Sequence, residues 1–239
     1  MTDYASLIEN IKSAGAEVVT GTLDDIFPKL DALLASRGAT WSQVVRTWFY
    51  LKDIDSCYAR FNELRTAHYA KHGLLSKLPA STGIGLQGER TSSAGERVFL
   101  PAELPPVTAA LLISIDEWHP VSSPHQTEAS SYGSSFSRAA LCGGRLYVSG
   151  TASLAGHDVA HIGDFAAQVK ETLAAVEAIL ASQGKSWSDV KRAIAYIKPG
   201  ASCLESGYSC PRLSEAQNLL VLHADICRPE WLFELEVDA

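Results

Sequence analysis

The chain reads LLASRGATWSQVVR at residues 33–46 and repeats this stretch as ILASQGKSWSDVKR at residues 179–192. About half of the aligned positions are identical, and the likeness continues into YLK at residues 50–52 and YIK at residues 196–198. Shared secondary-structure propensity does not easily explain so close a match, so the sequence indicates an internal repeat.

Each copy of the repeat has the pattern of an amphipathic helix followed by a strand. Apolar residues recur at helical spacing on one face in both copies: Ile26, Leu30, Leu33 and Leu34 in the first, and Val169, Leu173, Val176 and Leu180 in the second. Each helix ends at a glycine, Gly38 or Gly184, that suits the left-handed cap position. A Trp-Ser turn follows, and then a strand rich in β-branched and aromatic residues. The prediction is an α+β fold of two tandem units, residues 1–120 and 121–239, each a mixed sheet backed by helices.

Further elements flank the repeat. In the first unit we expect helices at residues 3–12 and 57–71, an extended segment at 79–85, a proline-containing loop at 88–106 and a strand at 107–116. In the second unit we expect strands at residues 139–141, 146–152, 219–227 and 232–237. The turn Gly143-Gly144 suits a hairpin between the first two of these strands. The first unit has no room for such a hairpin before its helix.

Composition excludes several classes of function. The chain has 239 residues, 46% of them hydrophobic, and a formal net charge of −7. Binding of nucleic acid needs clustered Lys and Arg, and no stretch supplies them. No apolar run approaches the ~20 residues that cross a bilayer, and residues 1–4 lack the basic flank and apolar region of a secretory signal. We therefore expect a globular protein without nucleic-acid or membrane partners.

The cysteines and histidines give no sign of a metal site or of a cofactor in this interpretation. Five cysteines form no C-x-x-C pair, so a reduced, cytoplasmic protein is the simplest expectation. His157 and His161 are four residues apart, but Gly163 and the loop around them argue against a metal-binding helix. We expect no metal and no organic cofactor.

Several blocks of the sequence resemble the chorismatases, a branch of the Rid (YjgF) superfamily. The resemblance to the superfamily rests on GRLYVSG at residues 144–150, the helix containing Gln168, the Gly184 cap and LFELE at residues 232–236. The chorismatase blocks are RTWFYL (46–51), FNELR (61–65), residues 79–85, SPHQ (123–126), Tyr132-Gly133, FSRA (136–139), SGTAS (149–153), Gly156-His157 and ADICRPE (224–230). They occur in order along nearly the whole chain.

This resemblance implies a reaction and an assembly. Chorismatases hydrolyse the enolpyruvyl ether of chorismate and release pyruvate, which places the chain in secondary metabolism or quinone biosynthesis. Members of this family are longer, so the first unit is expected to be truncated at its N-terminus. Rid folds assemble as trimers, and two fused units leave both a trimer and a monomer open. Rid deaminases carry an arginine after the second helix, and no arginine stands at residues 79–81 or 215–218.

Enol-ether hydrolysis needs an acid of raised pKa and cations that hold carboxylates. The family's essential glutamate aligns with Glu234, whose apolar strand neighbours would raise its pKa by desolvation. The alternative is that Glu234 and Glu236 form a solvated strand face. For the carboxylates we expect Arg138 and Arg65, with Arg46 behind them, since a guanidinium binds a carboxylate through two parallel hydrogen bonds.

Other side chains are weaker candidates for the same site. Tyr132, Tyr50 and Tyr147 could donate hydrogen bonds to substrate, although each also fits a buried aromatic role. The resemblance places Cys227 where some chorismatases that make 3-hydroxybenzoate carry a cysteine near the ring; a buried thiol of no chemical role is the alternative. Backbone amides around Thr82, Gly83 and Gly85 could approach an anion, or form a plain turn.

Three functions remain open at this point. The first is a chorismatase-like enzyme acting on a small carboxylate. The second is an enzyme with the same fold and site that acts on another substrate and catalyses a different reaction, such as a cyclisation or a dehydration. The third is a non-catalytic Rid-like binding module, for which Glu234, Arg138 and Arg65 would not converge on one cavity.

Overall fold

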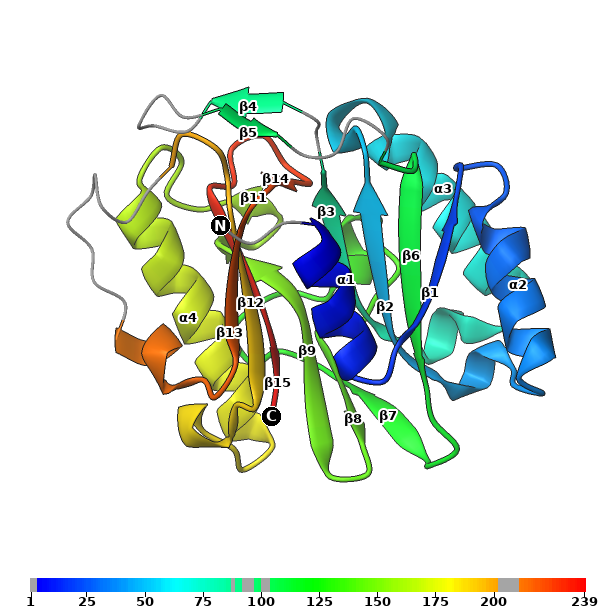
Figure 1. Cartoon of the computed structure of the whole chain (residues 1–239). Helices are drawn as coiled ribbons and strands as arrows, with labels where there is room; N and C mark the ends of the chain where they lie inside the picture. The colour runs from blue at the N-terminus through cyan, green and yellow to red at the C-terminus, as the bar shows by residue number, and fades with distance from the viewer. Residues whose placement is uncertain (1–3, 87–88, 92–96, 100–103, 202–210) are drawn as a thin grey trace.

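Two β-sheets pack face to face at the centre of the protein, and helices cover both outer faces (Figure 1). The computed structural model describes residues 4–86, 89–91, 97–99, 104–201 and 211–239. The first sheet has the strand order β1 (Glu17–Gly21), β6 (Val107–Ile113), β2 (Val44–Leu51), β3 (Ala80–Gly85) and β14 (Asp225–Ile226). The second has the order β13 (Leu219–His223), β12 (Arg192–Ile197), β15 (Phe233–Asp238), β9 (Arg145–Ala152), β8 (Ala139–Cys142) and β7 (Trp118–Val121).

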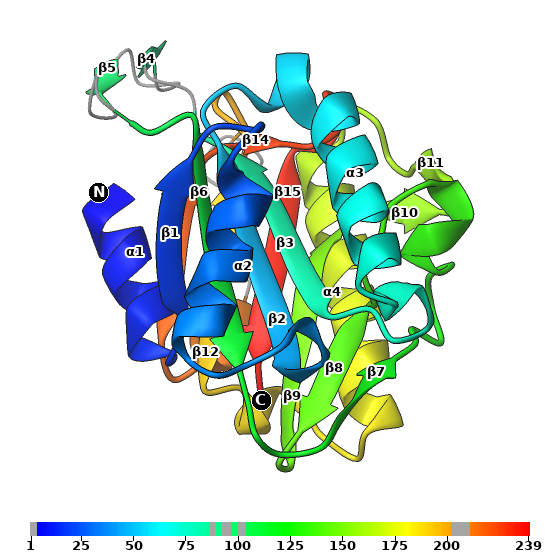
Figure 2. The ribbon, with the colours of Figure 1, turned by 90° about the vertical axis from the view of Figure 1, so that its right-hand side faces the viewer.

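Four α-helices complete these layers within the described residues. Helices α2 (Ile26–Ser36) and α3 (Ile54–Lys71) cover the outer face of the first sheet, as Figure 2 shows, and α4 (Phe165–Ser182) covers the outer face of the second. Helix α1 (Tyr4–Ser13) inserts Leu7 and Ile11 into the apolar core between the sheets. No helix among the described residues combines the length and apolar character that membrane crossing demands.

The strand pairing confirms the internal repeat. In the first unit β2 pairs with β3 in parallel and with β6 antiparallel, and β6 pairs in turn with β1. In the second unit β12 pairs with β13 in parallel and with β15 antiparallel, and β15 pairs with β9. The units therefore share one topology around α2 and α4, which confirms the predicted α+β fold of two tandem units.

The same local signals end the helix in each copy. Gly38 and Gly184 adopt positive φ angles of 63° and 67°, a conformation that costs glycine little. Capping boxes then start matching 3₁₀ turns, from Thr40 in the first copy and from Ser186 in the second. The helix–turn–strand path of the repeat is thus fixed by the residues that the two copies share.

The first unit has fewer strands before its helix than the second. In the first sheet only β1 precedes α2, whereas β7, β8 and β9 of the second sheet precede α4, followed by the short pair β10 (Leu154–Ala155) and β11 (Asp158–Val159). Strands β8 and β9 form the predicted hairpin, with Gly143 and Gly144 both at positive φ between the paired residues Cys142 and Arg145. The predicted helix at residues 3–12 is confirmed as α1.

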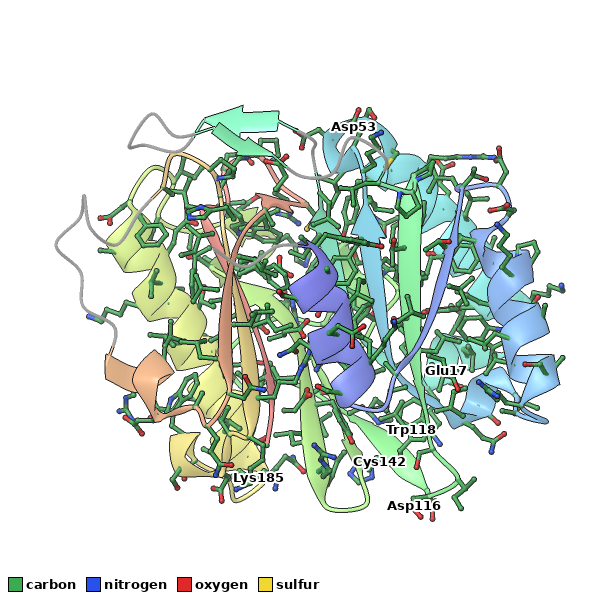
Figure 3. All side chains as sticks on the ribbon, viewed as in Figure 1. Glu17, Asp53, Asp116, Trp118, Cys142 and Lys185 are labelled. Atoms are coloured by element: carbon green, nitrogen blue, oxygen red, sulfur yellow. The ribbon has the colours of Figure 1, made fainter. Side chains whose placement is uncertain are left out.

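The structure corrects the prediction at several strands. The segment 219–227 is not one strand, because it leaves the second sheet after His223 and pairs as β14 with β3 of the first sheet. Strands β1 and β7 had no prediction; in β7, Trp118 pairs with Cys142 of β8 (Figure 3). The predicted loop 88–106 contains two short paired strands, β4 (Glu89–Thr91) and β5 (Arg97–Phe99), and its remainder lies partly outside the described residues. The predicted unit boundary at residue 120 falls within β7.

Candidate active site

A cavity of about 220 Å³ opens where the edge of the first sheet meets the second. Both sheets and α3 contribute to it. The residues that line it are Tyr58, Asn62, Arg65, Ser81, Gly83, Tyr132, Gly133, Ser134, Phe136, Arg138, Gly150, Ala152, Leu154, Cys227, Arg228, Trp231 and Glu234. All of them belong to one chain, and they come from sequence positions almost 180 residues apart.

Hydroxyl side chains fasten the two sheets together beside the cavity. The backbone amide of Ser81 on β3 donates to the Ser149 hydroxyl on β9 at 2.8 Å, and the Gly150 amide donates to the Thr82 hydroxyl at 3.1 Å. Ser149 and Thr82 are buried. These bonds fix the register between β3 and β9, so the cavity walls from the two units hold a defined separation.

Glu234 on β15 places a carboxyl group at the cavity without exposing it to bulk water. The residue is 4% exposed. Burial raises the pKa of Glu234 to about 8, the negative charge of Glu236 adds to the rise, and Arg138 opposes it. The carboxyl lies against Gly150, where a Cβ atom would collide with Glu234 Oε1. The alternative of a solvated strand face is therefore wrong, and Glu234 holds its proton at neutral pH.

Glu236, two residues further along β15, has the opposite electrostatic environment. It belongs to a buried ion-pair network in which Arg46 and Arg192 each contact both Glu236 and Asp238, at 2.9–3.0 Å. Burial alone would raise the pKa of Glu236, but the two guanidinium groups lower it below its ordinary value. The two carboxyl groups on this strand thus differ in protonation state at neutral pH. Glu234 is protonated and can donate a proton, whereas Glu236 is a carboxylate.

The network joins equivalent positions of the two repeats. Arg46 and Arg192 are the last residues of the aligned segments, and the equivalent tyrosines Tyr50 and Tyr196 hydrogen bond to each other at 2.9 Å. The acids break this symmetry. Glu234 lies opposite Tyr196 on β12, whereas Thr108 occupies the equivalent position opposite Tyr50. Only the second repeat therefore brings an acid to this position.

Two buried guanidinium groups lie on the cavity without an acidic partner. Arg65 and Arg138 are 1% and 3% exposed, and neither forms an ion pair with any described residue. Arg65 contacts Asn62 and Ser81, and Arg138 donates to the Thr127 carbonyl at 2.9 Å. A buried cation without a counter-ion is costly. The cavity is therefore electrostatically suited to an anion.

Aromatic rings alternate with guanidinium groups along one wall. The Phe136 ring lies 5.6 Å from the Arg65 guanidinium carbon and 5.7 Å from that of Arg138. Tyr132 lies in the same way between Arg138, at 5.5 Å, and Arg228, at 5.3 Å. Such contacts pack the guanidinium groups against the rings, and the hydrogen bonds to protein acceptors use only part of their N–H groups.

Helix α3 and the segment before β15 close the remaining side. Asp53 caps the start of α3 by accepting a hydrogen bond from the Ser56 amide at 3.3 Å (Figure 3). Tyr58 from α3 lies beside Cys227. Burial raises the pKa of the Cys227 thiol to about 12, so the group stays protonated and uncharged at neutral pH.

Comparison with known proteins agrees with this architecture. A chorismatase of Streptomyces rapamycinicus is 27% identical over 92% of this chain and 68% of its own length. A 3-hydroxybenzoate synthase of Streptomyces hygroscopicus is 25% identical over 82% of this chain and 63% of its own length. A solved chorismatase structure superimposes with a TM-score of 0.73 at 22% identity, covering 94% of this chain and 74% of that one.

The chain is similar to the chorismatases in sequence and in fold. This confirms the resemblance inferred from the ordered sequence blocks. The chain spans about two thirds of the length of the chorismatase relatives that it matches. No protein-family model matches it.

Of the residues predicted for the site, the structure brings five together: Glu234, Cys227, Arg138, Arg65 and Tyr132. The other three need correction. The Tyr50 hydroxyl is bonded to Tyr196 in the core between the sheets, and Tyr147 packs in that same core, so neither lines this cavity. Thr82 points beneath the cavity, where its hydroxyl contacts Arg46 at 3.2 Å.

The other weaker predictions have mixed outcomes. Gly83 lines the cavity, whereas Gly85 packs closely against Ile54 and Asp225. Arg46, the reserve candidate for a substrate carboxylate, instead pairs with the buried acids Glu236 and Asp238 and does not line the cavity. Gly85 and Arg46 therefore contribute to the packing of the sheets, and Gly83 alone of these three lines the cavity.

Several lining residues had no prediction. Tyr58 and Asn62 precede Arg65 by seven and three residues on α3, so one helical face carries all three, and this spacing is a signal in the sequence. Phe136 and Trp231 had no such signal, because their place depends on loops that fold over the sheets. The expectation of no metal site also missed a spacing, His68-x-x-x-His72, at the C-terminal end of α3.

Proposed function

We infer that the protein is an enzyme that hydrolyses the enolpyruvyl ether of chorismate, or of a closely related cyclic carboxylic acid, and releases pyruvate. One observation carries the proposal: a buried carboxyl group that keeps its proton at neutral pH shares a cavity with two buried guanidinium groups that have no acidic partner in the described part of the chain. The similarity to proteins named chorismatase and 3-hydroxybenzoate synthase supports the choice of substrate.

In the proposed reaction Glu234 is the general acid. Its proton adds to the methylene carbon of the enolpyruvyl group, and the ether carbon becomes an oxocarbenium ion. The Glu234 carboxylate then accepts a proton from the water that attacks this carbon. The resulting hemiketal collapses, its hydroxyl proton passes to the ring oxygen, and the bond from the ether carbon to that oxygen breaks. One water is consumed, and pyruvate and a ring alcohol leave.

The arginines hold the substrate in this scheme. Chorismate carries two carboxylates, and Arg65 and Arg138 offer two buried cations on the same cavity. Charge-assisted hydrogen bonds to them would replace the water that the carboxylates lose on binding. Arg228, at the outer end of the aromatic wall, provides a third positive group near the entrance.

Cys227 is proposed to contact the ring rather than the enolpyruvyl group. Its thiol lies on the cavity beside Tyr58 and is uncharged at neutral pH. Among the relatives, one bears the name 3-hydroxybenzoate synthase. We therefore assign to Cys227 an influence on which ring product forms, a dihydroxycyclohexadiene acid or a hydroxybenzoate, with pyruvate released in both cases.

The test is pyruvate release from chorismate, followed by coupled lactate dehydrogenase. We expect activity in the wild type, a loss of at least ~100-fold in Glu234→Gln, and no change in the matched control Glu63→Gln, whose side chain is 73% exposed on α3. We also expect the wild-type kcat/KM to fall above about pH 8, where Glu234 loses its proton. Background pyruvate from the wild type, or equal rates in Glu234→Gln and wild type, would contradict the proposal.

The same measurements address the two alternatives. An enzyme repurposed for another substrate would bind an aromatic or cyclic acid in this cavity but release no pyruvate from chorismate. The binding-module alternative expects Glu234, Arg138 and Arg65 on separate surfaces, whereas all three line one cavity. That convergence favours an enzyme.

A further inference from the structure

We propose that Asp31, His68 and His72 bind a divalent transition-metal ion of the zinc type at the junction of α2 and α3, a site separate from the cavity. His68 lies in the last turn of α3 and His72 directly follows the last helical residue, Lys71; both rings approach the carboxylate of Asp31. Asp31 reaches them from α2, which lies beside α3 (Figure 2). Two imidazoles and one carboxylate are a common ligand set for zinc.

The distances fit one metal ion. Asp31 Oδ1 lies 3.2 Å from His68 Nε2 and 3.4 Å from His72 Nε2, and the three ligand atoms all lie within 4.8 Å of one another. Zinc with ligand bonds of ~2.0–2.1 Å in a tetrahedron places its ligand atoms ~3.3–3.4 Å apart. An ion could therefore bind with only small side-chain movements.

A second observation concerns the His68 ring nitrogen. The His68 side chain is 9% exposed, and its Nε2 atom lies 3.2 Å from Asp31 Oδ1 but has no contact of good hydrogen-bond geometry among the described residues. A buried polar atom with such poor geometry is costly, and a metal ion between this nitrogen and the carboxylate would satisfy both. The Trp41 indole donates to Asp31 Oδ1 at 2.6 Å, which orients the carboxylate as outer-shell partners of metal ligands do.

The surroundings leave room for a further ligand. His72 and Asp31 are 28% and 33% exposed, so water can complete the coordination from the solvent side. The His68 ring is held on its inner side by Phe27 and Trp41, at centroid distances of 4.8 and 5.0 Å. The inner half of the site is therefore fixed by packing, and only its outer half is open.

A metal ion here would tie α2 to α3. The same helix carries Tyr58, Asn62 and Arg65 to the cavity, so the ion would restrain the helix that supplies one cavity wall. Because the ion binds the folded chain and not the unfolded one, it would also raise the free energy of unfolding. Neither effect depends on the reaction proposed above.

The test is a zinc titration of the EDTA-treated, dialysed protein by calorimetry. We expect one Zn²⁺ per chain, an affinity at least ~100-fold weaker in His72→Ala, and a zinc-dependent rise in Tm that the wild type shows and His72→Ala does not. Co²⁺ should give the visible absorption bands of tetrahedral coordination. Asp31→Asn serves as a second variant that preserves the side-chain shape if His72→Ala does not fold.

The matched control is His125→Ala, which removes another histidine–carboxylate pair, His125 Nε2 to Glu171 Oε1 at 2.7 Å. We expect this variant to bind zinc as the wild type does. The proposal is overturned by the absence of stoichiometric binding in the wild type. It is equally overturned if His72→Ala and Asp31→Asn bind as tightly as the wild type, or if binding disappears in His125→Ala instead.

Discussion

Replacement of Glu234 by glutamine should stabilise the protein at alkaline pH. The folded state raises the pKa of Glu234 from the ordinary 4.5 to about 8. Between these values the folded protein holds a proton that the unfolded chain releases, so the wild-type free energy of unfolding must fall as the pH rises through this window. Below pH 4.5 both states are protonated, and the effect vanishes. Glutamine is neutral throughout and lacks this dependence.

The size of the effect follows from the width of the window. Each pH unit between 4.5 and 8 lowers the free energy of unfolding of the wild type by ~1.4 kcal/mol. Once the pH exceeds 8, the total loss is about 5 kcal/mol. Between pH 6 and pH 9 the stability of Glu234→Gln relative to wild type should therefore rise by about 3 kcal/mol. A pH-independent cost of the amide group cancels in this difference.

Urea unfolding of both proteins at pH 6 and pH 9, followed by circular dichroism, measures this difference. Glu63→Gln on the exposed face of α3 is the control, and its stability relative to wild type should not change with pH in the same way. Parallel stability curves for wild type and Glu234→Gln would refute the reasoning, because Glu234 would then titrate alike in the folded and unfolded states. Loss of pyruvate release could still accompany that result, so stability and activity test separate claims.

Three further predictions concern the walls of the cavity and its surroundings. Gly150→Ala should lower kcat for pyruvate release at least ~10-fold, since the new Cβ would displace the Glu234 carboxyl; an unchanged kcat would mean that the carboxyl tolerates the shift. Arg138→Gln should lower kcat/KM by ~10- to 100-fold through the loss of a charged hydrogen bond to substrate, and steady-state kinetics that match the wild type would contradict this role. Tyr50→Phe should leave kcat/KM within ~2-fold and reduce the free energy of unfolding by ~1 kcal/mol, because it removes only the hydrogen bond to Tyr196; a large loss of activity with unchanged stability would restore Tyr50 to the site.

Local signals predicted most of the fold. Apolar spacing identified α2 and α4, the glycines at 38 and 184 marked their ends, and Gly143-Gly144 marked the hairpin. These features act over a few residues, so a single sequence suffices to recognise them. Strand β1 carried no comparable signal, because a short edge strand is defined by its partner β6 rather than by its own pattern.

The division of strands between the sheets could not be predicted in the same way. Residues 219–227 form one continuous extended pattern, yet the chain turns at Ala224 and gives β14 to the other sheet. That exchange depends on the free edge of β3, which lies about 140 residues earlier in the chain. A pairing partner at that separation leaves no trace in local periodicity.

The sequence by itself determined the repeat, the two helix-backed units and the candidates Glu234, Arg138, Arg65, Tyr132 and Cys227. Only the tertiary structure shows that the two neighbouring glutamates differ in protonation. Glu236 meets Arg46 and Arg192 and stays charged, while Glu234 faces the cavity and keeps its proton. A pKa depends on solvent exposure and on charges brought near in space, and both arise only when the two sheets pack together.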